Sequence, residues 1–368
     1  MDGQEEDGLE LLRSYAHGFM VSQVLFTSCQ LGVFDTLAQA PLHAATLATR
    51  LGCSLTGTRR LLDACVALRL LSLDARERWC MMGGRMDGWK GGWIGLSTHP
   101  GRYANTDMAA TYLTSDGPKS QRDMMLYLAQ TPYQLWAHLG HAVREGRNQY
   151  LRAFGTPSDD LFAAIYRADE EREAFHRALE ATWRLEGRRV LTAFDLSAFP
   201  VICDLGGGRG ALARVCASVY PRCRVSVLDA PDVLRGAPTP RRVRLRTGDF
   251  FRDALPRADL FLLARVLHDW PDAACQALLR RLRAALRPGG GVLLVEAFPP
   301  SRARAARVAL RMLSLNMLLQ TEGRERAPRQ YRRLLAAAGF AHARLARPPA
   351  SSAGLYGALL ATTAGPRP

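Results

Sequence analysis

The stretch Cys203–Ala213, which reads C-D-L-G-G-G-R-G-A-L-A, limits more than any other what this chain can fold into. The short apolar run F-P-V-I-C-D-L leads into it, and such a run, bounded by Pro200 and by glycines, predicts a buried strand. Apolar residues at helical spacing follow it, in A-L-A-R-V-C-A-S-V-Y. Glycines between a strand and a helix allow positive φ angles and close approach of a ligand. The first N–H groups of the helix also lack intrahelical partners. The stretch therefore predicts a strand, loop and helix of the α/β class.

Three interpretations of this loop are open at this point. A dinucleotide loop needs G-x-G-x-x-G or G-x-G-x-x-A, which Gly206, Gly208 and Ala211 satisfy. An S-adenosyl-L-methionine loop of the form D-x-G-x-G-x-G is satisfied by Asp204, Gly206, Gly208 and Gly210. A tight turn with a structural role alone is the third. The glycines do not distinguish between them.

Residues further along the chain favour a methyltransferase over a dehydrogenase. The next predicted strand, R-V-S-V-L-D, ends in Asp229, whose carboxylate could accept both hydroxyls of a ribose, although dinucleotide enzymes use such an acid too. The third and fourth predicted strands are followed by Gly248, Asp249 and Phe250, and by Arg265, His268 and Asp269. Open α/β sheets bind ligands at the carboxyl ends of their strands. Acids, an aromatic residue and a histidine at successive strand ends are typical of methyltransferases.

From Val201 onwards, predicted strands and helices alternate, which indicates a doubly wound, Rossmann-like sheet. A fifth strand, G-V-L-L-V-E, ends in Glu296, residues 302–320 have helical periodicity, and residues 355–362 form a last strand. The predicted domains are a winged-helix-like dimerisation domain over 1–120, a helical linker over 121–195 that contributes to the active site, and the cofactor-binding methyltransferase domain over 196–368.

The first 75 residues show helical periodicity and a helix, turn, helix pattern like that of a winged-helix module. The second helix of this pattern contains L-L-D-A-C-V-A-L, which is apolar on most faces and therefore predicts a buried helix. A helix that reads DNA would carry polar residues there, so we expect dimerisation instead. Residues 80–102 are rich in glycine, follow neither a strand nor a helix period, and are interpreted as an insertion.

Composition excludes several partners. The net charge is +15, but it comes almost wholly from arginines spread along the chain, so we expect no nucleic-acid partner. The 8 cysteines show no C-x-x-C pair and no histidine–cysteine cluster at metal spacing, so we expect neither a disulfide framework nor a metal. No apolar run reaches the roughly 18 residues of a membrane span. The acidic N-terminal residues do not resemble a signal peptide, and we expect a cytoplasmic protein with no membrane partner.

The segments D-L-G-G-G-x-G, G-D-F-F, A-R-V-L-H-D-W and P-G-G-G, with an acid at Glu325, together resemble the small-molecule O-methyltransferases that include plant caffeate and isoflavone enzymes. Further segments, among them Y-A-x-G-F-M-V-S-Q-V-L-F and S-L-N-M-L-x-Q-T-E-G-x-E-R, resemble the vertebrate hydroxyindole branch of that family over nearly the whole chain. This resemblance implies a homodimer that uses S-adenosyl-L-methionine to methylate the 5-hydroxyl of N-acetylserotonin, giving melatonin. A methyltransferase of another hydroxyindole or phenol, or a relative impaired by the 80–102 insertion, remains the alternative.

The resemblance also implies roles for individual residues. His268 would be the general base, because an imidazole titrates near neutral pH and general-base help is worth about 10²–10⁴-fold. Glu296 and Glu325 match the two acids that flank this histidine in the family. The cofactor-binding positions are Tyr166, Trp183, Asp204, Gly206, Gly208, Gly210, Asp229, Gly248, Asp249, Phe250 and Arg265, and the substrate-binding positions are Asp269, Asn316 and Gln320. Arg209 departs from the family, which has a small residue there, and would lower cofactor affinity if its side chain pointed into the loop.

Overall fold

The computed structural model describes residues 2–74, 101–157, 164–237, 241–299, 304–349 and 354–363. They form two compact units, one ending at Ala129 and the other beginning at Gln130. Nearly all of the predicted insertion at 80–102 lies outside the described residues. Its last residue, Arg102, belongs to a strand, so the insertion ends earlier than predicted.

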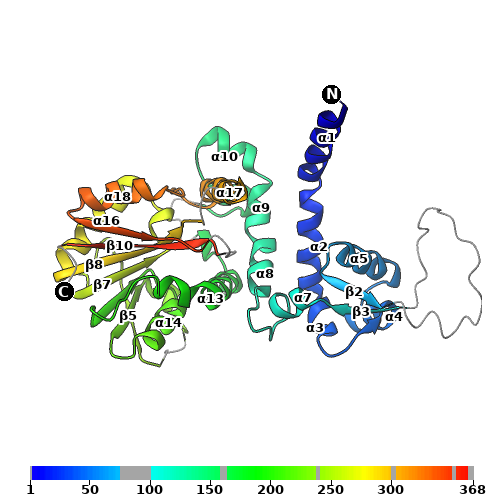
Figure 1. Cartoon of the computed structure of the whole chain (residues 1–368), viewed down its shortest axis with the longest axis horizontal. Helices are drawn as coiled ribbons and strands as arrows, with labels where there is room; N and C mark the ends of the chain where they lie inside the picture. Colours follow the sequence, from blue (N-terminus) through cyan, green and yellow to red (C-terminus); the bar gives the residue numbers. More distant parts are fainter. Residues whose placement is uncertain are drawn as a thin grey trace, which may run out of the picture. The chain divides into compact units, whose positions relative to one another are not determined.

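The first unit combines helices with a small antiparallel sheet (Figure 1). Its sheet has the order β1-β3-β2. The elements are α1 (Asp2–Ala16), α2 (Gly18–Leu31), α3 (Val33–Leu37), β1 (Leu42–His43), α4 (Ala44–Leu51), α5 (Leu55–Ala67), β2 (Leu71–Asp74), β3 (Arg102–Asn105), α7 (Asp107–Tyr112) and α8 (Arg122–Gln130).

The expectation that the helix containing L-L-D-A-C-V-A-L is buried on most faces is wrong within a single copy of the chain. Helix α5 is not buried on most faces: its buried residues are Thr58, Leu62 and Cys65, whose spacing marks one stripe. Asp63 and Ala67 are exposed, whereas Leu61, Ala64 and Val66 are half-buried. The apolar sequence L-L-D-A-C-V-A-L therefore gives one buried stripe flanked by half-buried residues, and not a helix buried all round.

The second unit begins with short helices and continues into a seven-stranded sheet. Its helices before the sheet are α9 (Pro132–Trp136), α10 (Leu139–Glu145), α11 (Tyr150–Phe154) and α13 (Asp169–Leu191). The strands are β4 (Val201–Leu205), β5 (Arg224–Asp229), β6 (Val243–Thr247), β7 (Ala258–Ala264), β8 (Leu286–Ala297), β9 (His342–Ala346) and β10 (Tyr356–Thr362). The helices among them are α14 (Ala211–Val219), α15 (Pro231–Leu234), η1 (Leu267–Asp269), α16 (Asp272–Ala285), α17 (Arg304–Gln320) and α18 (Pro328–Ala337).

The sheet has the order β6-β5-β4-β7-β8-β10-β9 (Figure 1). Strands β4 to β8 are parallel, whereas β10 runs antiparallel to β8 and to β9. The order therefore turns at β4, where the chain moves first towards β6 and then towards β9, and ligands bind at such switch points. Helices α13 and α14 cover one face of the sheet and α16 and α18 the other (Figure 1).

The predicted doubly wound, Rossmann-like sheet with a separate N-terminal domain before it is confirmed. Strand β9 and helix α18 were not predicted, and β8 begins at Leu286, before the glycines that were expected to precede it. None of the described helices has the length and apolarity that crossing a membrane would need.

Candidate active site

The glycine loop joins β4 to α14, and its backbone requires glycine. Gly206, Gly208 and Gly210 have φ angles of +67°, +57° and +78°, a region that L-residues with side chains rarely adopt. A Cβ on Gly207 would lie 2.6 Å from the carboxylate of Asp204. At Gly208 the nearest atoms would be ring atoms of His176, at 3.7 Å and beyond. The loop thus lies directly on Asp204 and leaves room beside Gly208.

Asp204 is a buried acid without a hydrogen-bond partner for either oxygen among the described residues. Burial, and then the neighbouring charge of Asp229, raise the pKa of Asp204 to about 8. An unpaired buried carboxylate is unfavourable on its own, and a positively charged ligand at the loop would relieve this.

Asp229 ends β5 and faces the loop. Its carboxylate accepts hydrogen bonds from the Gly208 N–H at 2.7 Å and the Ala230 N–H at 2.8 Å. Burial raises its pKa and these two bonds lower it, with a net value of about 6. A carboxylate has about four acceptor sites, so two remain for the hydroxyls of a ribose.

The residues after β6 meet the same loop. The Gly248 N–H donates to the backbone oxygen of Asp229 at 3.0 Å. The ring of Phe250 lies 3.7 Å from where a Cβ on Gly206 would be. Asp249 accepts a hydrogen bond from the Phe251 N–H at 2.7 Å, which orients its carboxylate. The chain therefore brings the predicted cofactor residues of β4, β5 and β6 together.

Arg265 follows β7 with a φ of +57°, which is unusual for a residue with a side chain. Its guanidinium lies 5.7 Å from the ring centre of Tyr356, whose ring lies 5.6 Å from that of Trp183 on α13. Strained backbone of this kind clusters at ligand sites. Tyr166 precedes α13 and stacks on His176, at 5.7 Å and 25°.

The side chain of Arg209 points away from the glycine loop and towards α13. Its guanidinium forms two hydrogen bonds with Glu173 of α13, one of them at 2.6 Å. Arg214 of α14 pairs with Glu180 of α13 at 2.7 Å in the same way. Arg209, which departs from the family pattern, therefore links the glycine loop to α13, and Arg214 links α14 to the same helix.

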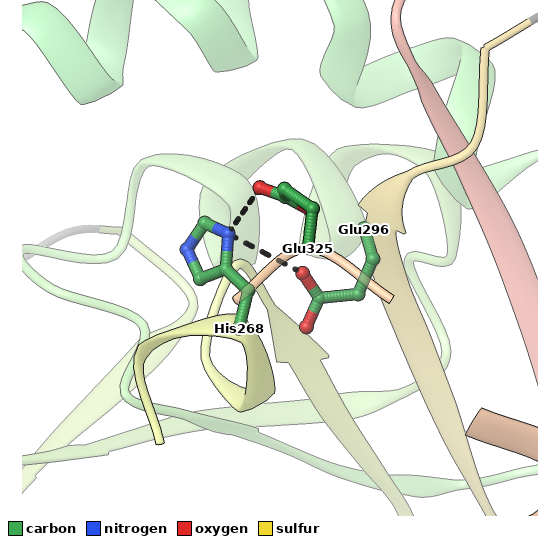
Figure 2. A group of neighbouring side chains, drawn as sticks. All are labelled: His268, Glu296 and Glu325. Atoms are coloured by element: carbon green, nitrogen blue, oxygen red, sulfur yellow. Dashed lines mark hydrogen bonds and ion pairs between the residues drawn. The ribbon is translucent and has the colours of Figure 1, made fainter. Parts of the chain in front are cut away.

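His268 lies in η1, at the carboxyl end of β7, with two acids beside it (Figure 2). Its Nδ1 is 2.8 Å from Oε1 of Glu325 and 3.7 Å from Oε2 of Glu296. Its Nε2 is 3.5 Å from Oδ1 of Asp269. Glu296, fully buried in β8, also accepts a hydrogen bond from the Leu267 N–H at 3.1 Å.

The neighbouring acids favour the protonated, positively charged form of His268. Burial lowers the pKa of His268, but Asp269, Glu325 and Glu296 together raise it by more, to about 9. Burial raises the pKa of Glu296 to about 8. With Nδ1 bound to Glu325, Nε2 is the nitrogen that can take a proton from a substrate.

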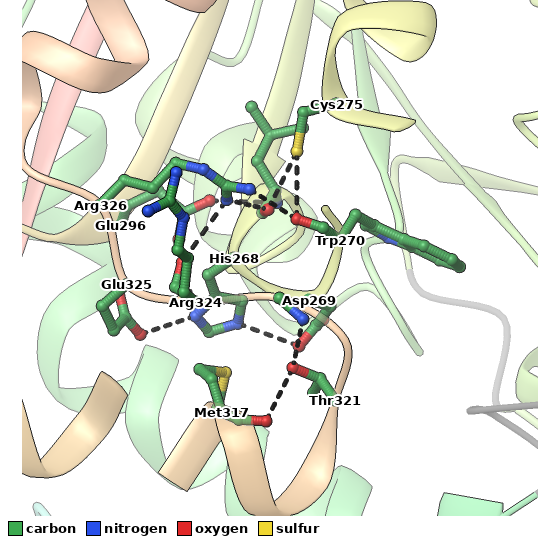
Figure 3. Close-up of polar contacts among 12 residues, drawn as sticks. His268, Asp269, Trp270, Cys275, Glu296, Met317, Thr321, Arg324, Glu325 and Arg326 are labelled. Carbon is green, nitrogen blue, oxygen red and sulfur yellow. Dashed lines mark hydrogen bonds and ion pairs between the residues drawn. The ribbon is translucent and has the colours of Figure 1, made fainter. Parts of the chain in front are cut away.

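The segment that carries Glu325 is held by Arg326 (Figure 3). This arginine is buried, and it donates to the backbone oxygens of Leu267 at 2.7 Å and Trp270 at 2.6 Å. It also donates from Nε to Asp272 at 2.8 Å. Gly323 passes so close to η1 that a Cβ there would lie 1.9 Å from the His268 backbone oxygen. Sequence reasoning gave neither residue a role, although both lie in the segment S-L-N-M-L-x-Q-T-E-G-x-E-R that carried the resemblance.

The predicted substrate residues lie on the last turns of α17 and in η1. Trp136 of α9 donates from Nε1 to Oδ1 of Asn316 at 3.1 Å, so the amide nitrogen of Asn316 is turned away from it. Gln320 is buried one turn later. Oδ1 of Asp269 lies 3.5 Å from Nε2 of His268.

Among the described residues, His268, Glu296 and Glu325 also form a group whose ligand atoms lie within 4.8 Å of one another and could hold a metal ion. The short bond between Nδ1 and Glu325 already joins two of these atoms. The same geometry therefore suits a histidine oriented by carboxylates.

Comparison with known proteins identifies the family. Residues 136–341 match the model of the O-methyltransferase domain, and residues 13–115 that of the O-methyltransferase dimerisation domain. The chain is 51% identical to acetylserotonin O-methyltransferase of Bos taurus, covering 98% of this chain and 99% of that one. It is 47% identical to the Homo sapiens protein of the same name, over 92% and 94% of the two chains.

This chain belongs to the O-methyltransferase family.

A solved structure agrees with that assignment. The structure of human N-acetylserotonin methyltransferase in complex with S-adenosyl-L-methionine has a TM-score of 0.85 and 45% identity, covering 96% of this chain and 97% of that one. The prediction of an O-methyltransferase with an N-terminal dimerisation domain is confirmed. The domain boundaries and the roles of single residues in this O-methyltransferase stay predictions.

Proposed function

We propose that this chain is an acetylserotonin O-methyltransferase, which transfers a methyl group from S-adenosyl-L-methionine to the 5-hydroxyl of N-acetylserotonin. The observation that carries the proposal is the position of His268, held through Nδ1 by Glu325 at the strand end beside a glycine loop with an unpaired acid. The names of relatives about half identical over nearly their whole length supply the substrate.

The residues present fit the cofactor. Asp204 is buried and unpaired beneath the loop, and the loop is open beside Gly208. Asp229 would take the ribose hydroxyls, and Asp249 with Phe250 would frame the adenine. Arg265, Trp183 and Tyr166 would close the other side. When bound, the cofactor supplies an electrophilic methyl group.

The chain's own contribution is orientation and a base. Aligning the acceptor oxygen with the methyl group can supply several kcal/mol, up to about 7–11 in ideal cases. Nε2 of His268 accepts the proton of the hydroxyl, whose pKa is about 10 in an ordinary phenol. Glu325 holds the ring and stabilises the resulting imidazolium. Asp269, Asn316 and Gln320 would position the indole.

Turnover of a panel of acceptors with methyl-labelled S-adenosyl-L-methionine tests this function. N-acetylserotonin, serotonin and a hydroxylated cinnamate are matched acceptors that differ in the acetyl group or the ring. We expect label in N-acetylserotonin at the highest kcat/KM. A higher kcat/KM with the cinnamate would contradict the assignment of N-acetylserotonin as the substrate, but not the assignment of methyltransferase activity.

We further propose a homodimer formed through the N-terminal domain. The match to a dimerisation domain supports it, as do the exposed apolar side chains of α1 and α2, namely Leu9, Leu12, Tyr15, Phe19 and Met20. Light scattering should give twice the chain mass. A single-chain mass at micromolar concentration would reject it.

Independence from metals and nucleic acid and a cytoplasmic location complete the proposal. The oriented histidine needs no metal for methyl transfer, so chelators should leave turnover unchanged. A loss of turnover with chelator, restored by one added metal, would assign the carboxylate group to that metal instead. Cell fractionation tests the location.

A further inference from the structure

His176 is a buried histidine that the proposed reaction does not yet use. It lies on α13, one turn after Glu173, and only 4% of its surface is exposed. Its ring is the nearest group to the space beside Gly208, with Nδ1 3.7 Å from where a Cβ would be. The ring thus borders the place where a ligand of the glycine loop must pass.

Aromatic neighbours fix the orientation of the His176 ring, but one of its nitrogens lacks a hydrogen-bond partner among the described residues. Tyr166 stacks on it at 5.7 Å and 25°, and Phe175 meets it at 64° with a 5.8 Å separation. Nε2 is buried and has no hydrogen-bond partner among the described residues. Most buried polar atoms are paired, and leaving one unpaired is unfavourable. Nδ1 is the ring nitrogen nearer to Gly208, and either nitrogen of a neutral imidazole can carry the N–H, so a molecule bound beside Gly208 can accept a hydrogen bond from this ring.

The surroundings keep the imidazole neutral. Burial lowers the pKa of His176 to about 4, and the charges of Arg209 and Arg172 act in the same direction against that of Glu173. A neutral imidazole has one N–H donor and one acceptor nitrogen. His176 therefore offers an N–H donor that carries no positive charge of its own.

The ligand offers a matching anion. The methionine group of S-adenosyl-L-methionine carries an α-carboxylate, an acceptor without a donor. Ionised Asp229 would repel it, and the Gly208 N–H already donates to Asp229. The ring of His176 is the group nearest to where a Cβ on Gly208 would point, so it can supply a donor there.

We propose that the ring N–H of His176 binds the α-carboxylate of the cofactor's methionine group. This inference rests on the proposed cofactor, and it adds a residue that the glycine-loop pattern does not contain. His176 would select an amino-acid-bearing nucleoside over one that lacks the carboxylate.

Calorimetry with two ligands tests it. S-adenosyl-L-methionine and decarboxylated S-adenosylmethionine differ only in the carboxylate. In His176→Phe, which keeps a ring to stack on Tyr166, we expect affinity for the first to fall about tenfold or more, the range for hydrogen bonds to charged groups. Affinity for the second should stay within about twofold. His176→Gln, which keeps a donor, should restore part of the loss. His342→Phe, at an exposed position of β9, is the matched control and should change neither affinity.

The outcomes separate this inference from the proposed function. An unaltered chain that does not bind S-adenosyl-L-methionine would reject the proposed function itself. A chain that binds it, with His176→Phe equally tight, would overturn the role of His176 alone. An equal loss for both ligands in His176→Phe would also overturn it, because the ring would then act only by packing.

Discussion

The charge on the histidine sets when this site can accept a proton. The acids beside His268 raise its pKa from 6.5 to about 9, although burial alone would lower it. A protonated imidazole cannot take the proton of the substrate, so kcat/KM should rise as pH passes from 6 to 9. The same acids make the deprotonated ring a stronger base.

Glu325→Gln should move that rise to lower pH. Removing one carboxylate removes a charge that favours the imidazolium, so the pKa of His268 falls, and kcat at the plateau falls with it. The measurement is kcat/KM against pH, which reports groups of the free enzyme. Glu322→Gln, at an exposed acid three residues away, is the matched control. An unmoved acidic limb in Glu325→Gln would contradict the assignment.

The hydrogen bond from Trp136 to Asn316 should act on substrate and not on cofactor. Trp136→Phe frees the Asn316 amide to rotate, and we expect KM for N-acetylserotonin to rise about three- to tenfold, the value of one hydrogen bond of 0.5–1.5 kcal/mol. Calorimetric affinity for S-adenosyl-L-methionine should stay the same. The effects of Trp136→Phe and Asn316→Ala should not add, because both remove one contact. Full additivity would show that the two residues act separately.

The segment after α17 shapes the site as an element. Arg326 donates to the backbone oxygens of Leu267 and Trp270, and Gly323 allows the two segments of the chain to touch. Glu325 and His268 thus come from separate segments, and these contacts fix the distance between their side chains. Packing, and not the acid alone, determines whether Glu325 reaches Nδ1.

Gly323→Ala should therefore disturb both stability and turnover. Its Cβ would overlap the His268 backbone oxygen at 1.9 Å, and overpacking of this kind costs about 1–3 kcal/mol. We expect a lower melting temperature and a lower kcat. Gly140→Ala in α10, where the nearest atom would be 3.5 Å away, is the matched control and should be neutral or stabilising. Equal effects of the two changes would show that the close approach is unimportant.

Local patterns predicted the elements that have their own signals. The glycine loop and the strands β4, β5 and β7 could be found because turn residues and apolar runs are contiguous in the chain. The residues of strand β9 are all exposed or half-buried and include no apolar run, so there was no strand signal in that part of the sequence. Helix α5 was misjudged because the letters do not say which apolar residues meet a core.

At the scale of the whole molecule, the buried acids make stability depend on pH. Asp204, Asp229 and Glu296 have folded pKa values raised by burial to about 8, 6 and 8. Their folded forms keep protons that the unfolded chain loses above about pH 4–5. The raised pKa of His268, about 9, adds stability that is lost as pH rises through that value. Asp204, Glu296 and His268 therefore make folding less favourable as pH rises from 6 to 9, whereas most of the change from Asp229 occurs between about pH 4 and 6.

The ligand-free protein should accordingly melt at a lower temperature at pH 9 than at pH 6.5. Net charge alone predicts the reverse, because the chain has a pI of about 10 and loses positive charge over this range. Asp204→Asn, which cannot ionise, should lessen the decline. Thermal unfolding at several pH values measures it. A melting temperature that rises with pH would show that net charge dominates.

Local sequence patterns alone would have predicted only part of the candidate site. The resemblance to a known family added site residues from distant parts of the chain. As expected from topology, Asp229, Asp249 and His268 lie at or just after the carboxyl ends of β5, β6 and β7. The partners Arg326, Trp136 and His176 could not be predicted, because each acts through a contact between segments far apart in sequence, and no local period records such a contact.

The base assignment is tested most directly by His268→Gln. Turnover of N-acetylserotonin and calorimetric affinity for S-adenosyl-L-methionine should be measured on the same preparation. We predict a fall in kcat of about 10²–10⁴-fold with cofactor affinity within about twofold, because Nε2 takes the substrate proton but His268 does not hold the cofactor. Unchanged kcat in this variant, with the cofactor still bound, would contradict the central claim that His268 is the base.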